Sequence, residues 1–175
     1  MQLETIQPHH DVTPAMRALM HVDPDTTNIT FHHDGADPAV VRAFIRKMAA
    51  DLNALPGALG GLPIEQTAHN GMVCRAMHIP KGMLLVGKVH KLDCINIVAK
   101  GAINLLTEHG AGRMVAGEQA ISPAGTQKIG FATEDTVFIN IFRCDEVSIE
   151  GIEEAIAWPS YEAFDAAQLL INQED

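Results

Sequence analysis

The segment from residue 64 to 144 constrains the fold most, because short β-rich runs alternate there with glycine and proline. The runs include GMVCRAMHI, GMLLVGKVH, CINIVAKGAINLLT, GRMVAGEQAISP and DTVFINIF. Turn signals recur about every ten residues, and this spacing is typical of an all-β sandwich or barrel. Residues 137–142 are apolar on both faces apart from Asn140, so we expect this strand to belong to a two-sheet structure.

A helix is predicted over residues 37–54, before the β-rich segment. Asp37 can serve as its N-cap, and Pro38 then takes the first helical position. The apolar face of this helix comprises Val40, Val41, Phe44, Ile45, Met48 and Leu52. Residues 1–35 are expected to be irregular and hold five of the nine histidines. No acidic or cysteine pattern accompanies these histidines, so we interpret them as solvated loop residues.

Helical spacing returns after the β-rich segment. A short helix is expected to end at Trp158, and a second helix to begin with Ser160 as its cap. The second helix would bury Phe164, Leu169 and Leu170. The expected organisation therefore has three parts: an N-terminal extension over 1–63, a β barrel over 64–144 and a helical tail over 145–175.

The composition excludes several classes of partner. The chain has 12 Lys and Arg against 22 Asp and Glu, a net charge of −10, whereas nucleic-acid and anionic-lipid partners require a cationic surface. No apolar segment reaches about 18 residues, and no signal peptide is expected at the start. The three cysteines have no zinc or disulfide spacing, so we expect free thiols.

Two stretches of the β-rich segment resemble the paired sequence motifs of the cupin superfamily. In GMLLVGKVHKLDCINIVAKG, residues 82–101, the spacing of Gly-x5-His-x-His-x3-Glu-x6-Gly is kept, but Lys88 replaces the first histidine and Cys94 replaces the glutamate. In residues 117–132, the spacing of Gly-x5-Pro-x-Gly-x2-His-x3-Asn is kept, but Lys128 and Ala132 replace the histidine and the asparagine. Of the four metal ligands of the family, only His90 is retained.

This resemblance implies a mainly β fold, a cupin-type double-stranded β-helix (jelly-roll) barrel, with an N-terminal helix and C-terminal helices. It also implies that the side chains of Lys88, His90, Cys94 and Lys128 share the barrel interior and are candidates for ligand binding. Two lysines would repel a divalent cation, so we expect no metal, no cofactor and no catalytic residue. A site with only His90 and Cys94 as metal ligands stays an alternative.

The four residues also allow other interpretations. A buried pair of ammonium groups at Lys88 and Lys128 needs compensating charge, which Asp93, Glu134, Asp135 or a bound carboxylate or phosphate could supply. Alternatively, both lysines extend to the barrel mouth and bury only their stems. Cys94 and His90 could also act as nucleophile and base, although a cysteine that simply packs in the core is the commoner case.

A narrower resemblance connects the phrases IPKGMLLVGKVHKLDCINIVAKG, SPAGTQKIGFATEDTVFINIF and PSYEAF with cupin-like proteins encoded by tailed bacteriophages and prophages. It implies a protein of the virion or the host cytoplasm. The function that we favour is a non-catalytic protein that acts by assembly, as a homo-oligomer or with other virion proteins, in decoration, connector or tail structures. Alternatives are a small-molecule-binding or metal-dependent cupin enzyme of isomerase, dioxygenase or sugar-binding type, and a protein that sequesters a host metabolite.

Overall fold

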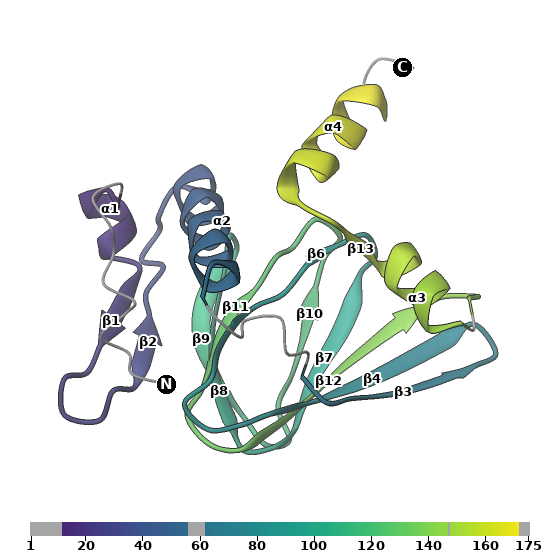
Figure 1. The fold of residues 1–175 in the computed structure, drawn as a ribbon, viewed down its shortest axis with the longest axis horizontal. Coiled ribbons are helices and arrows are strands. Elements are labelled where there is room, and N and C mark those ends of the chain that lie inside the picture. Colours follow the sequence, from purple (N-terminus) through teal and green to yellow (C-terminus); the bar gives the residue numbers. More distant parts are fainter. Residues whose placement is uncertain (1–11, 56–61, 147, 172–175) are drawn as a thin grey trace.

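Two antiparallel sheets face each other and enclose the interior of a β barrel (Figure 1). The computed structural model describes residues 12–55, 62–146 and 148–171. The larger sheet has the strand order β10-β7-β12-β4-β3, formed by Gln119–Ser122, Cys94–Lys100, Thr136–Arg143, Met72–Ile79 and Ile64–His69. The smaller sheet has the order β5-β11-β8-β9, formed by Leu84–Val86, Ile129–Ala132, Ala102–Thr107 and Gly110–Val115. The fold is therefore the mainly β jelly-roll barrel of cupin type that the sequence predicts.

Two shorter strand pairs and four helices complete the described part of the chain. The first pair joins β1 to β2, and the second joins β6 to β13; their bounds are Met20–Val22, Ile29–Phe31, Val89–His90 and Ala157–Trp158. The helices α1, α2, α3 and α4 comprise Pro14–Arg17, Pro38–Asn53, Ile149–Ile156 and Tyr161–Ile171. None of the helices in the described ranges is long and apolar enough to cross a bilayer.

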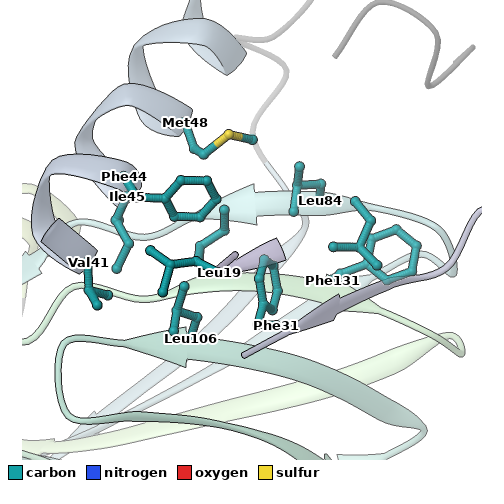
Figure 2. Close-up of a cluster of buried hydrophobic side chains, with 11 residues drawn as sticks. Leu19, Phe31, Val41, Phe44, Ile45, Met48, Leu84, Leu106 and Phe131 are labelled. Atoms are coloured by element: carbon teal, nitrogen blue, oxygen red, sulfur yellow. The ribbon is translucent and has the colours of Figure 1, made fainter. Parts of the chain in front are cut away.

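Helix α2 forms as predicted and packs on the outer side of the smaller sheet. The Asp37 side chain accepts a hydrogen bond from the backbone N–H of Ala39 at 2.9 Å, which caps the helix. Figure 2 shows the apolar side chains of α2 meeting those of the sheet and of the β1–β2 hairpin. The buried members of this cluster include Val41, Phe44, Ile45 and Met48 from α2, with Leu84, Leu106 and Phe131 from the sheet. The apolar face that could have formed subunit contacts is thus covered by the chain itself.

Three local expectations are wrong. Part of the segment expected to be irregular forms α1 and the β1–β2 hairpin, whose turn closes because the Asp23 carboxylate accepts a hydrogen bond from the N–H of Asp25 at 2.9 Å. These elements are too short for a periodic pattern to predict. The first tail helix ends at Ile156 rather than Trp158, because Ala157 and Trp158 pair with β6. Leu169 is 63% exposed instead of buried.

The glycines that bound the first motif occupy turns that require a positive φ angle. Gly82 has φ = 78° and Gly101 has φ = 76°, values that L-residues with a side chain rarely adopt. At Gly101 a methyl group would also overlap the backbone oxygen of Asp135. The glycine spacing of the motif therefore corresponds to a requirement of the backbone.

Candidate ligand site inside the barrel

Lys128 and His90, which belong to different motifs, meet inside the barrel. The Lys128 Nζ atom lies 3.2 Å from Nε2 of His90. Backbone hydrogen bonds hold the two segments together: the N–H of His90 donates to the oxygen of Thr126 at 3.0 Å, and the N–H of Gly87 donates to that of Lys128 at 2.8 Å. The strand geometry therefore fixes the contact between the two side chains.

The electrostatics of this pair follow from burial. Burial lowers the pKa of His90 to about 3, and the positive charges of Lys128 and Arg75 act in the same direction. Burial also lowers the pKa of Lys128 to about 8, against the opposing effects of Cys94 and Glu108. At neutral pH the pair is therefore an ammonium that donates a hydrogen bond to a neutral imidazole, with the imidazole proton on Nδ1.

A network of buried polar side chains continues from this pair along the inner face of the larger sheet. The Cys94 thiol donates to Oδ1 of Asn96 at 3.3 Å, and Nδ2 of Asn140 donates to the same oxygen at 2.7 Å. Nδ2 of Asn96 donates to Oγ of Ser122 at 2.9 Å. The sequence analysis did not identify Asn96 and Ser122 as site residues. The signal that could have found Asn96 is its parity with Cys94, which places both on one face of β7.

Cys94 is held as a neutral thiol rather than as a nucleophile. Burial raises its pKa, although the charge of Lys128 and the hydrogen bond to Asn96 oppose that effect. The polar contact of the His90 ring is with Lys128, and its aromatic contact is an edge-on approach to Phe142 with ring centroids 6.0 Å apart. The arrangement therefore gives no support to a Cys94–His90 nucleophile and base.

Lys88 does not join the other three candidates. Its side chain is 61% exposed, and its Nζ atom lies 2.8 Å from a carboxylate oxygen of Glu153 on α3. The other Glu153 oxygen pairs with Arg75 of β4. Burial raises the pKa of Glu153, but the hydrogen bond from Lys88 and the two positive charges outweigh it, and the pKa is lowered. The interpretation in which a lysine extends to the surface thus describes Lys88.

The acidic residues that could have neutralised a buried lysine form hydrogen bonds or ion pairs with other groups. Asp93 accepts a hydrogen bond from the N–H of Ala124, and Asp135 accepts one from the N–H of Lys81. Glu134 forms a surface ion pair with Arg113 at 3.3 Å. None of these three carboxylates is paired with Lys128.

A cavity of about 410 Å3 opens beside Lys128, between β7 and β10 on one side and β8 and β9 on the other. Its polar lining includes Asn96, Ser122, Thr126 and Lys128. Its apolar lining includes Leu105, Met114 and Ala120. The cavity therefore combines one cation and several hydroxyl or amide groups with an apolar wall.

The residues in this interior do not fit the metal centre of the cupin family. The inner group provides one neutral imidazole, a thiol whose pKa burial raises, and the Lys128 ammonium where the last histidine of the metal set would lie. Within the described ranges, no group of three or more His, Cys, Asp or Glu side chains gathers in a metal-binding arrangement. A protonated lysine cannot donate a lone pair and repels a cation.

Fold and site together define a jelly-roll barrel of cupin type whose interior holds a lysine next to a histidine. No family model matches the chain, and no curated protein matches it. Solved structures resemble it over about half of its length. KdgF from Halomonas sp. is 21% identical, with a TM-score of 0.44, over 50% of this chain and 83% of that protein. A cupin-2 domain protein from Shewanella frigidimarina is 16% identical, with a TM-score of 0.40, over 46% and 79%. An RmlC-like cupin from Methanocaldococcus jannaschii is 14% identical, with a TM-score of 0.41, over 51% and 86%.

Proposed function

We propose that this chain is a non-catalytic protein of cupin fold that acts by assembly, and that it pairs with a second copy through the outer face of its larger sheet. The observation that carries the proposal is the apolar composition of that face. Ile121 is 74% exposed and Ile95 is 44% exposed, although both are large aliphatic residues on neighbouring strands.

The strand register arranges the outer face in rows. One row runs across β10, β7, β12 and β4 through Ile121, Ile95, Ile141 and Cys74. The next row runs through Gln119, Ile97, Ile139 and Ala76. The two rows contain seven apolar residues and one glutamine. Exposed apolar patches of this extent are typical of protein interfaces rather than of free surfaces.

Two properties favour a second copy as the occupant. Two molecules with a net charge of −10 repel each other, so association is most favourable where their surfaces carry little charge. Over β10, β7, β12 and β4 the two rows carry none, and the second row reaches Glu65 only on the edge strand β3. The size also fits. With five strands, the longest of eight residues, the face measures about 24 by 27 Å, or about 650 Å2, against about 800 Å2 per partner in a standard interface.

Light scattering on the purified full chain tests this pairing. We expect a mass of about twice the 18.9 kDa of one chain, and a monomer for Ile95→Asp. The matched control is Ile149→Asp, because Ile149 is 66% exposed but lies on α3, outside this face. Dissociation of the control, or an unaltered chain that is monomeric at micromolar concentration, would overturn the proposal. If the chain formed a complex with another protein instead of a dimer, the face would belong to a different partner, and this result would also overturn the proposal.

The thiol of Cys74 provides a second measurement on the same face. It lies in the first apolar row and is half-buried, whereas Cys94 and Cys144 are buried. In a dimer that uses this face, a maleimide reagent should modify Cys74 slowly. In the Ile95→Asp variant Cys74 should react markedly faster, while Cys94 and Cys144 stay protected.

The finer proposal is that the assembled protein is an accessory or structural component of a virion, in a decoration, connector or tail structure. It rests on the resemblance of the two motif segments to phage and prophage proteins of cupin type. Mass spectrometry of purified virions from a host that carries the gene tests it. We expect the chain at a fixed ratio to a major virion protein. Its presence in the infected lysate but not in the particles would contradict a virion role and leave the pairing of two copies unaffected.

A further inference from the structure

We infer that the cavity beside Lys128 binds a small organic monocarboxylate, whose carboxylate pairs with the lysine and whose apolar body lies against Leu105 and Met114. The inference goes beyond assembly and does not rest on it: the cavity and the first apolar row share Ile121 at the edge strand β10, but the groups that would bind the ligand, Lys128, Thr126 and Ser122, are not in the rows.

The first ground is a cation without a direct counter-charge. The hydrogen bond of Lys128 is with a neutral imidazole, and among the described residues no carboxylate lies within ion-pairing distance of its Nζ atom. Glu108 is near enough to affect its pKa, but one of its oxygens lies 3.4 Å from Arg42. A partly buried ammonium with this environment is stabilised when an anion binds next to it.

The second ground is the set of hydrogen-bond donors that line the same cavity. The Thr126 hydroxyl is buried, lines the cavity and has no hydrogen-bond partner among the described residues. The Ser122 hydroxyl accepts a hydrogen bond from Asn96, so its own proton is free to donate. Both hydroxyls and the ammonium suit a carboxylate, which only accepts hydrogen bonds.

The third ground is the lining of the cavity. No Asp or Glu is among its described lining residues, and the nearby buried carboxylate of Glu108 is paired with Arg42. Leu105, Met114 and Ala120 provide an apolar wall, and the volume of about 410 Å3 lies in the usual range of small-molecule sites. A single lysine balances one negative charge. A phosphate dianion is usually held by several cations or by a bidentate arginine, so a monocarboxylate fits better.

Calorimetry on the full chain at pH 7 tests the inference with four probes: acetate, butyrate, hexanoate and benzoate. We expect saturable binding that strengthens from acetate to hexanoate as more apolar surface is buried. Lys128→Met should weaken binding by about tenfold to a hundredfold, because it removes a charge-assisted hydrogen bond. The matched control Lys88→Met should bind unchanged, because Lys88 lies on the surface.

Three further binding measurements test the roles of the Thr126 hydroxyl, of the ligand charge and of the carboxylate group. Thr126→Val should weaken hexanoate binding by a few fold while circular dichroism shows an unchanged fold. Hexanamide, which is uncharged, should bind far more weakly than hexanoate, and inorganic phosphate more weakly than butyrate. The inference is overturned if none of the four carboxylates binds saturably, if Lys128→Met binds them like the unaltered chain, or if phosphate binds more tightly. None of these results bears on the oligomeric mass, so a failure here and a failure of the assembly proposal are distinguishable.

Discussion

The Nζ atom of Lys128 lies 3.2 Å from Nε2 of His90, so a lysine ammonium donates a hydrogen bond to a neutral histidine inside the barrel. The two residues are 38 positions apart in the chain and belong to different motifs, and backbone hydrogen bonds between the motifs hold the contact. The fold thus keeps the geometry that brings the two motifs together and places a fixed positive charge there.

The first prediction concerns the pH dependence of stability. The pKa of Lys128 is about 8 in the folded chain and about 10.5 in an unfolded chain, so between these values the unfolded state binds more protons. The free energy of unfolding therefore rises with pH in this window. Lys128→Met should be more stable than the unaltered chain at pH 7, by about 1–3 kcal/mol, and this difference should shrink from pH 8 to 10.5.

Urea unfolding at closely spaced pH values measures this difference. Groups that do not interact with Lys128 largely cancel when the two curves are subtracted, whereas Cys94 does not, because the charge of Lys128 lowers its pKa. Lys88→Met is the control and should show a flat difference, because Lys88 is on the surface. A Lys128→Met variant that is less stable than the unaltered chain at pH 7 would contradict the assigned environment.

The second prediction concerns metal content. Because the interior provides one neutral imidazole, a buried thiol and an ammonium, protein purified without added metal should contain no stoichiometric iron, zinc, manganese or nickel. Inductively coupled plasma mass spectrometry on the full chain measures this. One bound equivalent that disappears in His90→Ala would show that the interior does hold a metal, and the anion site would then need another explanation.

The third prediction compares two glycines with nearly equal φ angles. Gly82→Ala should cost about 1–2 kcal/mol, because the left-handed backbone conformation is strained and the space around it is open. Gly101→Ala carries the same strain, and its methyl group also overlaps the backbone oxygen of Asp135. We expect an additional loss of about 1–3 kcal/mol at Gly101, measured by thermal and urea unfolding. Equal costs at the two positions would show that the turn relaxes.

The fourth prediction concerns the amide network on the inner face. Asn140→Ala removes the donor that lies 2.7 Å from Oδ1 of the buried Asn96, and it should lower the free energy of unfolding by about 1–3 kcal/mol. Asn53→Ala, which removes an exposed amide at the end of α2, should change it by less than about 0.5 kcal/mol. Similar effects of the two substitutions in urea unfolding would show that the network contributes no net stability.

Much of the fold was predictable from local patterns. Asp37 and Pro38 mark the start of α2, and the spacing of its apolar residues gives its buried face, because capping and periodicity are properties of neighbouring residues. The β1–β2 hairpin was not predictable, since its strands have three residues each and form only when Leu19, Ile29 and Phe31 pack under α2. The same holds for Trp158, whose strand pairing depends on a partner almost 70 residues earlier in the chain.

The residues of the candidate site were likewise only partly predictable from the sequence. The sequence indicated His90, Cys94 and Lys128, because their motif spacing is a local signal. It could not separate Lys88 from them, since the parity of an extended chain fails where a strand is interrupted, and Lys88 lies in the interruption between β5 and β6.

The sequence by itself determined the class of fold, because turn residues, alternation and motif spacing are encoded locally. Only the tertiary structure decided which lysine lies inside the barrel, which carboxylates pair with other groups and which face of the larger sheet stays uncovered. The physical reason is that burial and electrostatic pairing are properties of several strands at once. Lys128 is a cation without a direct counter-charge because Asp93, Glu134 and Asp135 bind elsewhere, and no single segment records that.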